Sequence, residues 1–302
     1  MAIKSENLRD GSCRTPLLSI IWGVTLLISG LPDFIFLTVN GAIPAWLFWV
    51  KEILLLGMIA TSFLLSSLKP LRKYLIVMAL LLGFYRLVSL AYSLPVWQER
   101  FGQMAWLVGT ASIRILVVVI AFIMMGALLV MGLRRRDFFF TKGKLDAPAD
   151  GVRWLGLKEG TPWTKFAPIF TLIVFLVLLV ILVFTTKVPL RLAATSLLWL
   201  PMFVFIAGIN SFGEELGIRA PMLSTIYPVI GKNQAILLTA VYFGLLHLDS
   251  WPAGAVWAFE TGFLAWILAK SMLETRGSLW AWLIHLVVDI PVYAFMAMQS
   301  LK

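Results

Sequence analysis

The sequence predicts an all-α fold, a polytopic transmembrane helical bundle of eight or nine spans. Of its 302 residues, 61% are hydrophobic and only 13% are charged. The mean hydropathy of +0.94 is far above that of ordinary water-soluble domains. Apolar stretches long enough to cross a bilayer, which takes about 20 residues, recur along the chain. No large soluble domain fits between them.

Nine apolar segments can be marked, separated by short polar stretches and by turn residues. The fifth and sixth are divided only by TKVPLR, and the sixth runs on into NSFGEELGIR, so the count is eight or nine. The segments lie at about 17–38, 43–67, 73–94, 110–132, 167–186, 190–212, 233–249, 252–273 and 278–298.

One long polar connection divides the chain. Residues 134–166 carry Gly, Pro and Asp at intervals that break both helix and strand patterns, and we expect a cytoplasmic linker there. Before it, residues 1–133 form an N-terminal membrane region of about four spans. After it, residues 167–302 form a C-terminal region whose polar motifs lie between positions 210 and 290.

The positive charge of the chain comes mostly from loops between the apolar segments. The formal net charge is +10, and Lys and Arg gather in alternate loops, as is typical of loops kept on the cytoplasmic side of a membrane. We therefore expect a multi-pass plasma-membrane protein with a cytoplasmic N-terminus, in contact with the lipid bilayer and not with nucleic acid. Cys13 is the only cysteine, which excludes an intrachain disulfide and a cysteine metal cluster. The N-terminus lacks a cleavage-site pattern, so we expect a retained first span.

Ionisable side chains inside apolar segments are the first candidates for a functional site. Each costs about 2.5–3.5 kcal/mol at the centre of a bilayer on insertion scales, so its presence needs a reason. In the C-terminal half they form three clusters. These are Glu214, Glu215 and Arg219 in GEELGIR, His247 in FGLLH, and His285 with Asp289 in HLVVD.

Helical spacing assigns faces to these side chains. Glu215 and Arg219 are four residues apart, so they face each other and can form an ion pair. Glu214 points about 100° away from Glu215 on a helix and is left to act as a base on another surface. His285 and Asp289 are also four apart, so one helix face can present both together.

The second cluster adds an aromatic ring and a predicted hairpin. Phe243 lies one turn before His247 on the same helical face. The turn-like stretch TIYPVIGK lies midway between Glu214 and His247, so a hairpin there brings these two residues level. His285 fits this hairpin only if the stretch DSWPAG is a break inside the protein, which is tolerated where irregular backbone lines a water-filled cavity.

Taken in order, E-E-x-x-x-R, F-x-x-x-H and H-x-x-x-D resemble the motif set of the CAAX-processing and bacteriocin-processing (CPBP) family of intramembrane proteases. That family includes the type II CAAX prenyl endopeptidases and abortive-infection-like relatives. The chain's only two histidines are the two that the pattern requires. The resemblance covers about residues 190–300 and implies a glutamate-type endopeptidase. Its substrate is expected to be a CAAX-type or other membrane-associated peptide or protein, cut near the membrane face.

The resemblance also implies roles for the site residues, without a required cofactor. Glu214 and His247 activate a water molecule. His285 and Asp289 stabilise the oxyanion that forms when this water attacks the scissile carbonyl. The supporting residues are Glu215, Arg219 and Phe243.

The sequence departs from the family pattern in two places. CAAX-processing members usually carry Asn where this chain has Asp289, and an ionised aspartate repels an oxyanion. Asp289 is therefore expected either to be protonated or to orient His285 by accepting its second ring proton. The pair Ala220-Pro221 follows Arg219 directly, and because proline bends or ends helices we expect a kink there.

Other interpretations of the same residues stay open. The Glu215–Arg219 pair can be purely structural. A zinc-dependent membrane protease would use His247, His285 and Glu214 as ligands, although the chain has no H-E-x-x-H motif. From other classes come a proton-coupled transporter, which would normally show inverted repeats that are not visible here, and a non-catalytic immunity or scaffold protein.

Charged residues also occur in the apolar segments of the N-terminal half. Asp33, Lys51, Glu52, Arg86 and Arg114 lie within these segments or at their edges. They could line a path for the substrate. The adjacent Lys51 and Glu52 are expected either to lie at the membrane interface or to neutralise each other.

Overall fold

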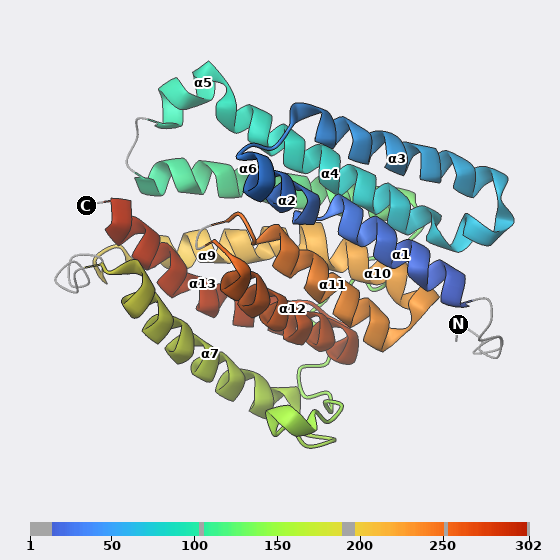
Figure 1. Ribbon diagram of the computed structural model, residues 1–302. Helices are drawn as coiled ribbons and strands as arrows, with labels where there is room; N and C mark the ends of the chain where they lie inside the picture. Colours follow the sequence, from blue (N-terminus) through green and yellow to red (C-terminus); the bar gives the residue numbers. More distant parts are fainter. Residues whose placement is uncertain (1–13, 103–105, 189–196, 251–252, 301–302) are drawn as a thin grey trace. The chain divides into compact units, whose positions relative to one another are not determined.

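The structure is a computed structural model that describes residues 14–102, 106–188, 197–250 and 253–300 (Figure 1). Within these ranges the chain forms helices and connecting segments. The β contacts there are two isolated bridges, Pro148 to Pro162 and Val152 to Leu157. The all-α prediction is therefore confirmed for the described part of the chain. Cys13 and part of the expected break at DSWPAG lie outside the described residues.

The helices follow one another with short connections. In the first half they are α1 Arg14–Ile28, α2 Leu31–Asn40, α3 Ala45–Leu64, the 3₁₀ turn η1 Ser66–Leu71, α4 Arg72–Ser93, α5 Pro95–Trp97, the π-turn η2 Gln98–Gly102 and α6 Trp106–Val130. In the second half they are the 3₁₀ turn η3 Arg153–Leu155, α7 Trp163–Thr186, α9 Leu200–Glu214, the π-turn η4 Glu215–Arg219, α10 Ala220–Ile230, α11 Lys232–Leu246, α12 Ala255–Thr275 and α13 Leu279–Ser300.

Six helical segments in the described residues are long and apolar enough to cross a membrane, or seven if a bent pair counts as one span. The bent pair is the first predicted segment, which breaks by 45° between α1 and α2. The chain is an integral membrane protein, but the predicted count of eight or nine spans is not confirmed. One reason is that α11 contains only 15 residues, too few for a 30 Å hydrocarbon core at about 1.5 Å per residue. Part of the predicted segment 190–212 lies outside the described residues.

The chain divides into two compact units. Unit 1 contains residues 1–83 and 222–266, and unit 2 contains residues 84–221 and 267–302. Both units therefore combine N-terminal with C-terminal segments. The three-part division expected from the sequence, at residues 133 and 166, stays a prediction.

In unit 1, the break between α1 and α2 is stabilised by a buried lysine. Lys51 donates from Nζ to the carbonyl oxygen of Ser29, 3.0 Å away, which lies at the break, and it forms an ion pair with Asp33. The ammonium thus satisfies a polar backbone group that the interrupted helix leaves without its usual partner. The expectation that Lys51 and Glu52 neutralise each other is wrong, because Asp33 is the partner of Lys51.

In unit 2, helices α9 and α13 share an apolar core. Phe203, Ile206 and Ala207 of α9 pack with Tyr293 and Ala297 of α13. Figure 1 draws these two helices beside each other. Trp282 of α13 adds a polar contact by donating its indole N–H to the carbonyl oxygen of Gly208, 3.0 Å away on α9. Helices α9, which carries Glu214, and α13, which carries His285 and Asp289, are therefore held together by an apolar core and by a hydrogen bond.

The polar connection after α6 is tied to the turn between α12 and α13. Trp280 donates its indole N–H to the carbonyl oxygen of Leu145 at 3.0 Å, and Thr141 donates to the carbonyl oxygen of Arg276 at 2.8 Å. Glu274 accepts from the indole of Trp163 at 2.9 Å. This connection is thus an ordered part of unit 2, although its cytoplasmic location stays a prediction.

Two glycines allow α6 to approach the helical run of α9 and η4 closely. A Cβ atom at Gly213 would lie 2.8 Å from Cγ1 of Val117, and one at Gly217 would lie 3.2 Å from the Cα of Ala121. Small residues four apart are the usual means by which membrane helices come close. Since Gly213 directly precedes Glu214, this packing brings α6 next to the predicted catalytic carboxylate.

We expect Gly213→Ala to destabilise the protein by about 1–3 kcal/mol, the usual cost of overpacking. The added methyl group meets Val117, a stiff β-branched side chain. A second change, Val117→Ala, removes the clashing methyl and should restore much of the loss. Thermal unfolding of the detergent-solubilised protein measures both effects. The control is Gly126→Ala in α6, where a Cβ meets nothing within 4 Å, and equal melting temperatures for Gly213→Ala and Gly126→Ala would contradict the packing argument.

Candidate active site

The first motif lies on a helical run that continues from Leu200 to Ile230. At Glu215–Arg219 the run widens into a π-turn, in which the N–H of Ala220 donates to the carbonyl oxygen of Glu215 five residues earlier. Such single π-turns inside α-helices are frequent at functional sites. The helix continues through Pro221 as α10 after the widened turn, and the kink expected there stays a prediction.

Glu215 and Arg219 form the ion pair that their spacing predicts. Nε of Arg219 lies 2.7 Å from Oε2 of Glu215, and Nη2 lies 3.0 Å from Oε1. Both side chains are 0% exposed. A buried carboxylate needs such a bidentate partner, because an unpaired charge in the interior is costly.

The same carboxylate reaches across to α13. Nδ1 of His285 lies 2.8 Å from Oε1 of Glu215. Since an ionised carboxylate only accepts hydrogen bonds, Nδ1 is the donor. Glu215 therefore accepts the Nδ1 proton of His285, and the expectation that Asp289 is protonated or orients His285 stays a prediction.

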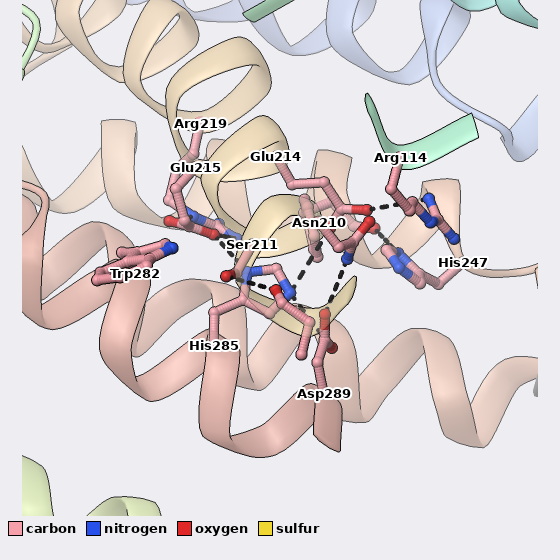
Figure 2. A network of polar contacts seen from close by, with 12 residues as sticks. Arg114, Asn210, Ser211, Glu214, Glu215, Arg219, His247, Trp282, His285 and Asp289 are labelled. Atoms are coloured by element: carbon pink, nitrogen blue, oxygen red, sulfur yellow. Dashed lines mark hydrogen bonds and ion pairs between the residues drawn. The ribbon is translucent and has the colours of Figure 1, made fainter. Parts of the chain in front are cut away.

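The other nitrogen of His285 lies midway between two carboxylates. Nε2 is 3.6 Å from Oε2 of Glu214 and 3.6 Å from Oδ1 of Asp289. Both distances are too long for a direct hydrogen bond. Glu214, His285 and Asp289 thus lie together in unit 2, as the sequence predicts (Figure 2).

Asn210 is a member of this cluster that sequence reasoning missed. Its Nδ2 donates to Oδ2 of Asp289 at 2.8 Å, and the side chain lies between Glu214 and Asp289 in Figure 2. Its Oδ1 is buried and has no hydrogen-bond partner among the described residues. The available signal was an amide one turn before Glu214 in an otherwise apolar helix.

Arg114 brings a second cation to Glu214. Its Nη1 lies 4.0 Å from Oε1 of Glu214, and its guanidinium carbon lies 5.8 Å from the ring centroid of Tyr293. Arg114, one of the charged residues noted in the N-terminal half, thus contacts a motif residue within unit 2. By contrast, Ser211 donates its hydroxyl to the carbonyl oxygen of Ala207 at 2.7 Å, which is an ordinary intrahelical bond.

His247 belongs to unit 1, where it caps the C-terminus of α11. Its Nδ1 lies 2.8 Å from the carbonyl oxygen of Phe243, which can only accept, so Nδ1 is the donor. The Phe243 ring lies 4.7 Å from the imidazole, which confirms that the two rings share a face. Backbone angles of −98° and 4° put His247 in the sparsely populated bridge region, where many active-site residues occur.

The next feature of these residues is their ability to hold a metal ion. In the described ranges, no group of three or more His, Cys, Asp or Glu side chains is placed to hold a metal ion. The zinc alternative, with His247, His285 and Glu214 as ligands, therefore rests on residue types alone.

Comparison with known proteins bears on the C-terminal half. Residues 194–291 match a family model described as type II CAAX prenyl endopeptidase, Rce1-like. This match confirms the resemblance that the motifs indicate, and it includes all three motifs from Glu214 to Asp289. No curated protein and no solved structure matches the chain significantly.

Proposed function

We propose that this membrane protein, in which residues 194–291 match the type II CAAX prenyl endopeptidases, is an intramembrane endopeptidase that uses a water molecule activated by Glu214. The observation that carries the proposal is the equal spacing of His285 Nε2, 3.6 Å from both Glu214 and Asp289. A polar separation of this length suits a bridging water or substrate oxygen.

Glu214 is the general base in this proposal. Its Oε2 accepts a proton from the attacking water as the water oxygen bonds to the scissile carbonyl carbon. The same carboxyl group then gives the proton to the leaving amine when the C–N bond breaks, so the enzyme returns to its starting state. Positioned general bases of this kind contribute about 10²- to 10⁴-fold to the rate.

His285 is the candidate electrophile. Its Nδ1 donates to Glu215, so the protonated ring directs its Nε2–H toward the oxygen that becomes negative. The carboxylates of Glu214, Glu215 and Asp289 stabilise this positive charge, and Arg219 keeps Glu215 ionised. Asp289, held by Asn210, thus favours the imidazolium instead of contacting the oxyanion.

His247 is the fourth proposed catalytic residue, on the basis of the motif F-x-x-x-H. With Nδ1 donating to the carbonyl oxygen of Phe243, Nε2 of the neutral ring is the nitrogen that would serve as a second base. We further propose that the substrate is a CAAX-type or other membrane-associated peptide, that no cofactor is needed, and that the protein lies in the plasma membrane with a cytoplasmic N-terminus. The alternating Lys and Arg loops support this orientation.

The test is cleavage of a set of peptides, prenylated and not, by the purified protein in a chelator. We expect mass-identified products from wild type, and none from His247→Ala or His285→Ala. Loss of activity in chelator with recovery by Zn²⁺ alone would favour the zinc-dependent protease. Equal turnover by the variants and wild type would refute these residue assignments, and no turnover by wild type would favour the transporter or non-catalytic alternatives.

A further inference from the structure

Arg114 is the only charged residue in α6, a 25-residue helix that is otherwise apolar. It lies outside residues 194–291, the range of the family match, and outside the three motifs. A charged group at the centre of a membrane helix costs about 2.5–3.5 kcal/mol on insertion scales. An arginine in such a helix therefore needs a compensating partner or a function.

The packing of α6 directs Arg114 toward the carboxylate cluster. Val117 and Ala121 form the face of α6 that meets Gly213 and Gly217. Arg114 is one turn before Val117 on that face. The close approach allowed by the two glycines thus places the guanidinium beside Glu214, with Nη1 4.0 Å from Oε1.

The guanidinium at this position keeps hydrogen-bonding capacity. The 4.0 Å separation from Glu214 is an ion pair and not a hydrogen bond. Its Nε is buried and has no hydrogen-bond partner among the described residues. Arg219, the other arginine of the cluster, already holds Glu215 in a bidentate pair. Arg114 is consequently the arginine that can donate to an oxygen atom arriving beside Glu214.

Charge balance shows why such a donor is needed. Glu214 and Asp289 place two carboxyl groups beside Nε2 of His285, and peptide hydrolysis adds a further negative charge on the carbonyl oxygen. Like charges in a low-dielectric interior repel strongly. A fixed cation that already lies in the site stabilises this developing charge without reorganisation during the reaction.

We propose that Arg114 is a further catalytic residue, which donates from its guanidinium to the tetrahedral oxyanion that forms beside Glu214. The inference rests on the proposed peptidase function. In this step the water oxygen bonds to the carbonyl carbon, the C=O π electrons move to the oxygen, and the water proton goes to Glu214. Arg114 stays protonated throughout.

The experiment compares Arg114→Gln, Arg114→Lys and the control Arg136→Gln, an exposed arginine of the polar connection after α6. The substrates are one farnesylated peptide with a free C-terminal carboxylate and the same peptide as its C-terminal amide. We expect Arg114→Gln to lower kcat by about 10²- to 10³-fold for both peptides, with little change in KM. Arg114→Lys should retain part of the rate because it keeps the charge, and Arg136→Gln should match wild type.

A binding measurement separates catalysis from folding. The probe is a phosphinate analogue of the peptide, which replaces the scissile amide by an anionic tetrahedral group and so resembles the oxyanion. Arg114→Gln should bind the phosphinate about 10²-fold more weakly than wild type does. Its affinity for the uncleaved peptide, in which the scissile amide is intact, should be unchanged. Equal weakening of both ligands would indicate misfolding or simple substrate binding and would overturn the proposal.

The outcomes distinguish this inference from the proposed function. Full activity in Arg114→Gln together with none in Glu214→Gln contradicts the inference alone. A loss confined to the peptide with the free carboxylate shows that Arg114 anchors the substrate terminus, which also overturns it. Phosphinate binding that depends on Arg114 without any turnover supports the anion site and contradicts hydrolysis. Failure of wild type to bind the phosphinate contradicts both.

Discussion

Replacing Glu214 with Gln is expected to lower kcat by about 10²- to 10⁴-fold, the contribution of a positioned general base. The amide has nearly the same shape as the carboxyl group but cannot accept the proton of the attacking water. Because the contacts of Glu214 with Arg114 at 4.0 Å and His285 at 3.6 Å are longer than hydrogen bonds, the stability of the fold should change little. Steady-state kinetics and thermal unfolding of the same preparation measure the two effects.

Two further variants make this result specific to Glu214. Glu214→Asp keeps the carboxylate but shortens the side chain, and it should retain more activity than Glu214→Gln. Glu260→Gln removes a carboxylate from another membrane helix, α12, and should leave kcat unchanged. A Glu214→Gln enzyme that turns over as fast as wild type would refute Glu214 as the base.

Breaking the Glu215–Arg219 pair should produce the largest loss of stability. Glu215→Met leaves Arg219 buried without its bidentate partner, and removing one member of a buried pair costs about 3–5 kcal/mol. The double variant Glu215→Met with Arg219→Leu removes both charges and should recover most of this loss. Denaturation of the solubilised proteins, followed by tryptophan fluorescence, gives the comparison.

Activity should follow a different pattern from stability in these variants. Even when stability is restored, the double variant lacks the acceptor that holds Nδ1 of His285, so kcat should stay low. Recovery of both stability and activity would show that the pair is only structural. That result would leave His285 without its proposed orienting residue.

Much of the helical architecture follows from composition and local spacing. Long apolar stretches predict the membrane helices because a spanning helix must satisfy its backbone polar groups internally. The break between α1 and α2 was not predicted, since its compensating group, Lys51, lies 22 positions away from Ser29. The π-turn at Glu215–Arg219 likewise depends on how the helix packs, which the sequence does not state directly.

For the candidate site, the sequence predicted contacts within one helix but did not predict contacts between helices. The four-residue spacing correctly paired Glu215 with Arg219. It could not reveal that Glu215 also holds His285, a contact between residues 70 positions apart. Arg114 and Asn210 were underestimated for the same reason, because each is a single polar residue in an apolar helix. Their significance appears only when the packing of α6, α9 and α13 brings them to Glu214 and Asp289.

The most direct test of the account is a single-turnover reaction of wild-type protein with a cleavable peptide in H₂¹⁸O containing a chelator. Direct attack by an activated water puts one ¹⁸O atom into the new carboxyl terminus during the first turnover, and mass spectrometry of the product should detect it. An unlabelled first-turnover product would mean that a carboxylate of the enzyme attacks the peptide. Product formation only after metal is restored would instead contradict the proposed metal-independent mechanism.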